Sequence, residues 1–302
     1  MSDLKPKRPL GGLSVRDAMR RMVVTVPATA AIEQAIRRSV KFKVNAVLVT
    51  DRKGIGVGFV SKMNIVGAYY AGLPITTPVE DVMTSPPAVC HPLASLDSAL
   101  DTMRAQGIDR LYVSGNARGE IVGVLAYPDI VGLLYRYCRQ CEKSTIRIRR
   151  SGEEYILADR YKVCEVMNPQ VQLHQVNHSV MDVMEEMWLR QSGTTLIVDR
   201  QGRPAGVISL TDLVIAYNRR LSSQATARAL MHSPVRVCPH DEYLITAIRR
   251  MIASDMQRLF VYKEHPENII GVLSLHDAAR VRSGSCLACM RGRIDIDSLF
   301  YT

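Results

Sequence analysis

Apolar residues along the chain follow two spacings, one typical of helices and one typical of strands. The helical spacing i, i+3, i+4, i+7 occurs at Leu96, Ala99, Leu100 and Met103 and again at Leu244, Ala247, Ile248 and Met251. Short apolar runs of strand length follow such helices at 45–51, 110–115, 195–200 and 258–263. After each run we expect a turn, a second strand beginning at or near a glycine, and a final helix. The pattern predicts a β-α-β-β-α unit that occurs four times.

The four units stand in a fixed register. Each begins around an aligned methionine, at Met19, Met83, Met167 and Met231. Each ends in Gly-apolar-apolar-x-x-x-Asx, and we call the last residue of this motif the closing residue: Asn64, Asp129, Asp212 and Asp277. The shift from unit 1 to unit 3 is 148 residues (167 − 19), and it is the same from unit 2 to unit 4 (231 − 83). A constant shift indicates a duplicated pair of repeats.

A single unit of this size has too little core to be stable alone, so we expect units 1 and 2 to pair as module 1 and units 3 and 4 as module 2. The predicted fold class is α+β. The predicted boundaries are 13–72, 79–137, 161–220 and 226–284 for the four repeats, with a cysteine-containing linker at 138–160 and a cysteine-containing tail at 285–302.

The unit plan and its closing motif, with Ser or Thr three residues before Asp or Asn, resemble the cystathionine β-synthase (CBS) domain. The resemblance covers roughly residues 13–137 and 161–284. It implies two Bateman modules, which generally bind adenosine nucleotides (AMP, ADP or ATP) in clefts between paired units and signal to a protein partner. Such modules commonly associate into discs, so we expect either an intramolecular disc or a homodimer. The chain carries no Gly-rich phosphate loop or nucleophile elbow, which favours a regulatory protein over an enzyme.

The resemblance also implies a set of ligand residues. Ribose and phosphate oxygens would be held by Ser61 with Asn64, Ser209 with Asp212, Ser274 with Asp277, and Asp129. An Asp at a strand-to-helix junction is also an ordinary cap, but capping alone is not expected to require the hydroxyl three residues earlier. In unit 2 that hydroxyl is missing, because the position is Ala126.

Two arginines are the candidate phosphate ligands, because Arg donates charge-assisted hydrogen bonds to phosphate oxygens. Arg110 and Arg258 precede the first long strand of units 2 and 4, and a surface salt bridge is the alternative role for each. Counting back from the closing glycine places Asn45 and Gly193 in this register in units 1 and 3. Adenine walls would come from Val171, Val235 and Val237, which are equally suited to the core. Module 2 is therefore predicted to be the better nucleotide site.

Two Cys-x-x-Cys pairs occur at the same 148-residue shift, Cys138 with Cys141 and Cys286 with Cys289. Together they supply the four thiolates of a structural zinc site. The alternating segments that follow, 146–149 and 294–297, carry Arg on one copy and Asp on the other, so they are suited to pair as strands. The hypothesis is a zinc-ribbon-like hairpin that joins the modules; a redox dithiol and plain free thiols are the alternatives.

Charge and hydropathy bear on partners and location. The net charge of +10 favours anionic partners, namely nucleotides, nucleic acid or an acidic protein. A second functional hypothesis is therefore a nucleotide-controlled, nucleic-acid-binding regulator that uses the basic segment 136–150 with the zinc ribbon. No apolar run approaches the roughly 20 residues of a membrane span, and the start of the chain lacks an apolar secretory core. We expect no membrane association and a cytoplasmic protein.

Overall fold

The computed structural model describes residues 13–117, 119–140 and 161–280. Module 1 follows the predicted order twice. Unit 1 comprises α1 (Val15–Ala18), β1 (Thr25–Pro27), α2 (Ile32–Lys41), β2 (Ala46–Thr50), β3 (Gly56–Ser61) and α3 (Lys62–Tyr70). Unit 2 comprises the single-turn helix η1 (Val79–Asp81), β4 (Val89–Cys90), α4 (Leu96–Ala105), β5 (Arg110–Ser114), β6 (Ile121–Ala126) and α5 (Tyr127–Gln140).

Module 2 repeats this order. Unit 3 comprises η3 (Val163–Glu165), β7 (Leu173–Gln175), α6 (Val180–Leu189), β8 (Thr194–Val198), β9 (Pro204–Ser209) and α7 (Leu210–Asn218). Unit 4 comprises η4 (Ala227–Ala229), β10 (Val237–Pro239), α8 (Leu244–Ala253), β11 (Arg258–Tyr262), β12 (Ile269–Ser274) and α9 (Leu275–Arg280). In every unit the first strand is parallel to the second and the second is antiparallel to the third, forming a three-stranded sheet.

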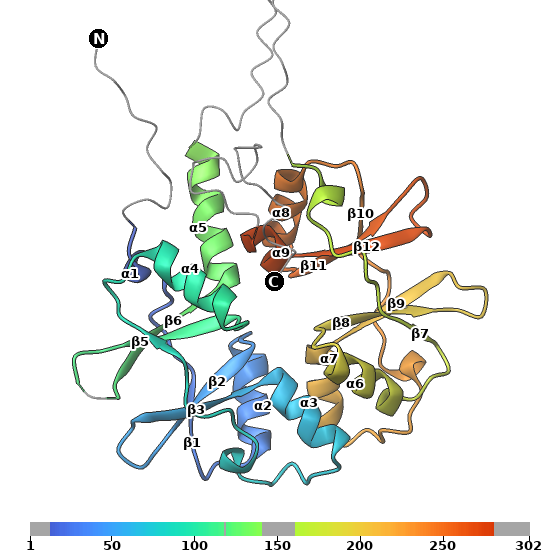
Figure 1. The fold of residues 1–302 in the computed structure, drawn as a ribbon. Coiled ribbons are helices and arrows are strands. Elements are labelled where there is room, and N and C mark those ends of the chain that lie inside the picture. The colour runs from blue at the N-terminus through green and yellow to red at the C-terminus, as the bar shows by residue number, and fades with distance from the viewer. Residues whose placement is uncertain (1–12, 118, 141–160, 281–302) are drawn as a thin grey trace, which may run out of the picture.

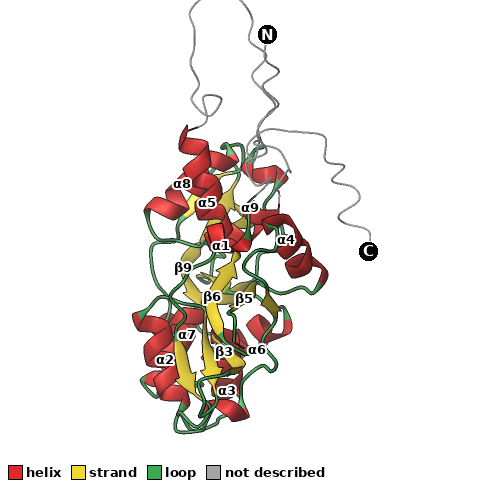
Figure 2. Cartoon of the chain, turned by 90° about the vertical axis from the view of Figure 1, so that its left-hand side faces the viewer, coloured by secondary structure: helices red, strands yellow, loops and turns green. Residues whose placement is uncertain are grey.

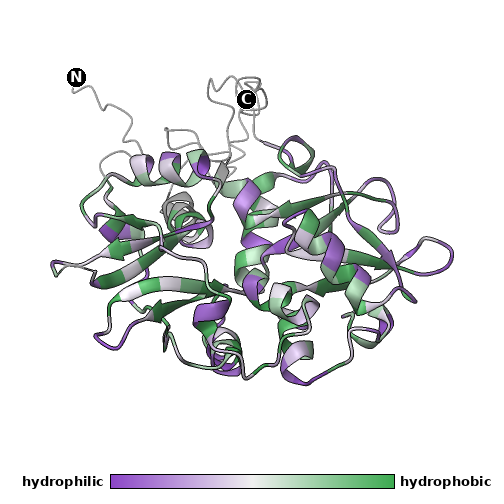
Figure 3. Cartoon of the chain, turned by 60° about the horizontal axis from the view of Figure 1, so that its bottom comes forward, coloured by the Kyte–Doolittle hydropathy of each residue, from purple (hydrophilic) through white to green (hydrophobic). Residues whose placement is uncertain are grey.

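The apolar spacing predicts the helices correctly because it marks the face that is buried. In α4, Leu96, Leu100 and Met103 are fully buried. The helix begins where the Ser95 hydroxyl accepts a hydrogen bond from the Ser98 amide (3.1 Å), satisfying one of the free N–H groups of the first turn. Figure 3 shows the same division over the molecule, with apolar residues along the strands and polar residues over the loops at the rim.

The two units of a module exchange a short segment, which explains why the methionines are aligned. We call the residue after each aligned methionine the crossing residue: Arg20, Thr84, Asn168 and His232. Thr84 of unit 2 bridges to Phe59 on strand β3 of unit 1 through two backbone hydrogen bonds of 2.9 Å. The three other crossing residues bridge to β6, β12 and β9 of the other unit in the same way. The predicted pairing of unit 1 with 2 and of 3 with 4 is therefore confirmed.

The modules face each other through their helices. One buried core joins units 1 and 3 and a second joins units 2 and 4. The four units surround a common centre in Figure 1, and the molecule is flatter in the perpendicular view of Figure 2. The structure thus has the intramolecular form of the two predicted arrangements. No helix among the described residues is both long enough and apolar enough to cross a membrane.

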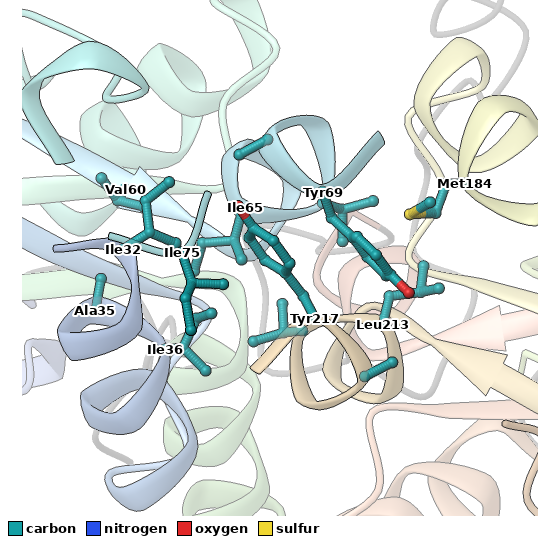
Figure 4. Close-up of a cluster of buried hydrophobic side chains, with 14 of the residues drawn as sticks. Ile32, Ala35, Ile36, Val60, Ile65, Tyr69, Ile75, Met184, Leu213 and Tyr217 are labelled. Atoms are coloured by element: carbon teal, nitrogen blue, oxygen red, sulfur yellow. The ribbon is translucent and has the colours of Figure 1, made fainter. Parts of the chain in front are cut away.

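The contact between α3 and α7 shows the near-twofold relation of the modules. The rings of Tyr69 and Tyr217 stack with centroids 4.9 Å apart, as Figure 4 shows. The Tyr69 hydroxyl donates to the Leu221 carbonyl (2.6 Å), and the Tyr217 hydroxyl donates to the Leu73 carbonyl (2.5 Å). Both pairs of residues differ by the shift of 148 found in the sequence (217 − 69 and 221 − 73). Burial of both rings raises the pKa of each phenol.

Candidate functional site

A cavity of about 1440 Å³ lies where the four units meet, and all four contribute to its wall. Eight of the predicted nucleotide ligands line it: Arg110, Arg258, Ser61, Asn64, Ser209, Ser274, Asp277 and Val171. Four predicted ligands are not part of its wall: Asp129, Asp212, Val235 and Val237. Segments distant in sequence are thus brought to one chamber, which exceeds the typical volume of a small-molecule site.

Each serine of the closing motifs is a helix cap, and this corrects one sequence expectation. Ser209 is the N-cap of α7: its hydroxyl oxygen accepts from the Asp212 amide (3.4 Å), and Asp212 Oδ2 accepts from the Ser209 amide (2.7 Å). At the start of α9 the Ser274 hydroxyl oxygen accepts from the Asp277 amide (3.2 Å), and Asp277 Oδ2 accepts from the Ser274 amide (2.8 Å). This reciprocal capping box needs Ser and an acidic residue three positions apart, so the hydroxyl is explained without a ligand. The expectation that capping would not require it was wrong.

In every unit one side-chain oxygen of the closing residue accepts from the backbone amide three residues earlier, which leaves the other polar atom available for a second contact. In three units that second atom is held by a crossing residue: Asn64 Nδ2 donates to Thr84 Oγ1 (3.2 Å), Arg20 Nε donates to Asp129 Oδ1 (2.7 Å), and His232 Nε2 lies 2.8 Å from Asp212 Oδ1. Burial raises the pKa of Asp129, although the neighbouring Arg20 guanidinium opposes this. In unit 4, Asp277 Oδ1 has no hydrogen-bond or ion-pair partner among the described residues.

Arg110 is neutralised within its own unit. Its guanidinium donates to both carboxylate oxygens of Asp109, Nε to Oδ1 at 2.8 Å and Nη2 to Oδ2 at 2.6 Å. The group lies 5.8 Å above the centre of the Phe59 ring. Burial acts to lower the pKa of Arg110, but attraction and hydrogen bonding from Asp109 and Tyr112 together raise it. Burial raises the pKa of the adjacent Tyr112 to about 12. The salt-bridge alternative considered for Arg110 is therefore the contact it makes, although in the cavity wall instead of on an open surface.

Arg258 is the equivalent residue of module 2, and it has no such partner. The residue before it is Gln257, at the position of Asp109 after the shift of 148 (257 − 109), so no carboxylate neutralises it there. No ion pair or hydrogen bond of its guanidinium is found within the described part of the chain. Burial lowers the pKa of Arg258, with Asp277 attraction opposing. The group lies against Gly193, where an added Cβ would be 2.3 Å from Arg258 Nη2.

The strand register differs by one residue from the sequence expectation. Arg110 pairs across the sheet with Ala126, and the equivalent pair in unit 1 is Ala46 with Ser61. The residues in register with the two arginines are therefore Ala46 and Thr194, and not Asn45 and Gly193. The loop between the second and third strands is one residue longer in units 2 and 4, and counting back across it causes the error.

Lys62 is a cavity residue that the sequence reasoning missed. Its side chain is buried, and Nζ donates to Thr211 Oγ1 of the other module (2.9 Å). Burial lowers the pKa of Lys62, while Asp212 raises it and Arg110 adds to the lowering. A signal was present: the equivalent position is apolar or aromatic in the other units, at Tyr127, Leu210 and Leu275.

The cysteine hypothesis falls outside this site. Cys138 lies in α5, but its side chain and the whole of Cys141, Cys286 and Cys289 are outside the described residues. Within the described ranges, no group of three or more His, Cys, Asp or Glu residues is arranged to hold a metal ion. The four-cysteine zinc site therefore stays a prediction.

Comparison with known proteins establishes the family. The sequence model of the CBS domain matches residues 15–71, 79–136, 163–219 and 227–284. These four matches cover most of the chain, so the chain belongs to the CBS-domain family, and its fold is that of four CBS repeats in two Bateman modules.

Three individual proteins illustrate the relation. Protein MJ1225 from Methanocaldococcus jannaschii, described as a putative archaeal homologue of g-AMPK, has a TM-score of 0.73 at 17% identity, covering 89% of this chain and 99% of that one. PAE2072 from Pyrobaculum aerophilum, a CBS-domain protein solved in complex with AMP, is 26% identical over 39% of this chain and 89% of its own, with a TM-score of 0.37. The transcriptional repressor CcpN of Bacillus subtilis is 30% identical over 115 residues, which are 36% of this chain and 54% of the repressor. The match thus spans about half of the repressor.

Proposed function

We propose that this chain is a non-enzymatic regulatory protein that binds an adenosine nucleotide in the cleft of unit 4. The observation that carries the proposal is the pair formed by Arg258 and Asp277. A partly buried guanidinium and a carboxylate oxygen, neither with a hydrogen-bond or ion-pair partner among the described residues, line the same cavity. Burying an unpaired charge is unfavourable, so an anionic ligand that pairs with Arg258 would restore the lost solvation.

The polar groups fit the parts of a nucleotide. A ribose diol donates hydrogen bonds, and Asp277 Oδ1 is a free acceptor for them. A phosphate accepts hydrogen bonds, and the Arg258 fork is a free donor. Val171 belongs to the segment of unit 3 that runs onto the sheet of unit 4, and it lines the same cavity with its backbone neighbours Pro169 and Gln170. We infer that adenine lies against this segment, which supplies both an apolar wall and backbone hydrogen-bonding groups.

Module 1 is poorly equipped for the same ligand. Its arginine, Arg110, is paired with Asp109, and the closing residue Asp129 is held by Arg20. A nucleotide would have to break two charged contacts before it made any. We therefore infer one strong nucleotide site per chain, in module 2.

Calorimetric titration with AMP, ADP, ATP and S-adenosylmethionine tests the proposal. We expect at least one to bind with a stoichiometry of one per chain and to raise the melting temperature by mass action. Arg258→Met should weaken binding by about 10- to 100-fold, the range for losing a charged hydrogen bond. The matched control is Arg236→Met, because Arg236 is an exposed cation on the same cavity wall, and it should change affinity much less. Absence of binding by every ligand would remove the proposal.

A nucleic-acid-binding regulator is the second candidate. It is favoured by the net charge of +10 and by the likeness to part of a transcriptional repressor. A gel shift with random duplex DNA, with and without nucleotide and at two salt concentrations, tests it. Binding that weakens steeply with salt would support phosphate contacts, and no shift at low salt would exclude it.

A further inference from the structure

We propose that the crossing residue decides which clefts can accept a ribose, with Arg20 closing the cleft of unit 2 and Asn168 leaving that of unit 4 open. The proposal deepens, and rests on, the proposed nucleotide function. The proposed role of the crossing residue does not require that residue to contact the ligand itself. The crossing residue would act on the ligand only through the closing residue of the other unit, as a positioning residue.

The four crossing residues start from equivalent places. Each forms an antiparallel bridge to the strand residue five positions before the closing residue: Thr84 to Phe59, Arg20 to Val124, His232 to Val207 and Asn168 to Val272. The amide of each crossing residue donates to the strand carbonyl at 2.9 Å in all four units. Because the four backbones match, the side chain of the crossing residue determines whether the closing residue of the other unit has a protein partner.

Arg20 forms an ion pair with the closing residue of unit 2. Its Nε donates to Asp129 Oδ1, and the Asp129 side chain is only 11% exposed. The carboxylate then has both oxygens engaged, because Oδ2 accepts from the Ala126 amide (2.9 Å). A neutral diol cannot replace a guanidinium there without leaving the buried carboxylate without its counter-charge. Asp129 is thus unavailable although its residue type fits.

Asn168 makes a different contact. Its side-chain oxygen accepts from the Gln170 amide (2.9 Å), a local turn that Asn favours, and Pro169 stands between the two residues. The side chain is thereby engaged with its own segment and leaves Asp277 Oδ1 without a protein partner. His232 is intermediate, since it contacts Asp212 from a side chain that is 74% exposed. We expect the order of availability Asp277, then Asp212, then Asp129.

The test is to place the side chain found in unit 1 at the open cleft. Asn168→Arg should pair with Asp277 as Arg20 pairs with Asp129, and should weaken nucleotide binding by at least about 10-fold. Asn168→Met is the matched control, because it has comparable length without charge, and should retain binding within about 3-fold, the ordinary context-dependent scatter of such contacts. Both variants are checked for an unchanged unfolding transition in the full chain.

The outcomes separate the two proposals. Asn168→Arg binding like the wild type, or Asn168→Met losing as much as Asn168→Arg, overturns the role of the crossing residue while leaving the nucleotide function in place. A wild-type chain that binds no adenosine ligand overturns the nucleotide function instead. In that case the ligand-free crystal structure of the Asn168→Arg variant tests the role of the crossing residue. A guanidinium hydrogen-bonded to Asp277 supports that role, and a guanidinium directed elsewhere overturns it.

Discussion

Gly58 is the strand position where the exchange between units can be tested most directly. A Cβ at Gly58 would lie 2.6 Å from Met83 Sδ and 2.8 Å from the Thr84 carbonyl oxygen. The sulfur belongs to a flexible side chain that can move, but the carbonyl belongs to the bridging backbone. Gly58→Ala should therefore push the crossing segment of unit 2 away from strand β3.

The expected loss follows from the contacts. Displacing the segment breaks the two backbone hydrogen bonds between Phe59 and Thr84, each 2.9 Å long. At a net value of about 0.5–1.5 kcal/mol per bond, this is about 1–3 kcal/mol. Forcing a methyl group against Met83 adds about 1–3 kcal/mol of overpacking. We expect Gly58→Ala to lower the free energy of unfolding by about 2–6 kcal/mol, a large part of the roughly 5–15 kcal/mol typical of a folded domain.

Equilibrium unfolding in guanidinium chloride measures this change, with Gly132→Ala as the matched control. Nothing lies within 4 Å of a Cβ at Gly132, which is inside helix α5, so Ala there should be neutral or stabilise by up to about 1 kcal/mol. The double variant Gly58→Ala/Met83→Ala removes the sulfur contact but not the carbonyl contact, so it should recover none of the hydrogen-bond loss. A Gly58→Ala variant as stable as the wild type would refute the argument from the close approach.

Three further results are expected. Gly193→Ala should weaken nucleotide binding in calorimetry by about 10-fold or more, because its Cβ would lie 2.3 Å from Arg258 Nη2 and displace the guanidinium; unchanged affinity would argue against Arg258 as a ligand. Burial lowers the pKa of Lys62 below its ordinary 10.5, so the unfolded chain binds more protons just below pH 10.5 and stability rises with pH through that window. Denaturant unfolding of the Lys62→Met variant at several pH values should show no such rise in stability. Identical pH dependence of stability in the variant and the wild type would contradict this role of Lys62. Zinc measured in the purified protein should fall on Cys141→Ser, and zinc content unchanged by the substitution would end the clamp hypothesis.

The repeat itself could be predicted because its signals are local. The helix face of Leu96, Leu100 and Met103 is buried as its spacing indicates, and the constant register between modules reappears in the stacking of Tyr69 on Tyr217. The helix spacing depends only on residues close in sequence, and the constant register follows from the duplication of the module. Both patterns are visible in the sequence without knowledge of how the units pack.

The occupancy of the site could not be predicted, because it depends on contacts between distant segments. Nothing in the sequence near Asp129 indicates that Arg20 pairs with it across 109 positions (129 − 20). The arginine register failed for a different reason: one extra residue in the loop before β6 or β12 shifts every position counted back across it. The Ser-x-x-Asp pattern is visible in the sequence, but it does not by itself distinguish a capping box from a ligand site, because the same residue types suit both.

The difference between the modules also suggests how a ligand signal would leave the site. Arg258 follows Gln257, whose side-chain oxygen accepts a hydrogen bond from Asn45 Nδ2 of module 1 (3.4 Å). Asp255, two residues earlier, pairs with Lys43 of module 1. A phosphate that pairs with Arg258 would therefore act directly beside Asp255 and Gln257, which precede β11 and contact module 1 at the cavity. Units 1 and 3 share a buried core that holds their helices together. We therefore expect the ligand to change how the two modules meet at the cavity, with that core acting as the hinge.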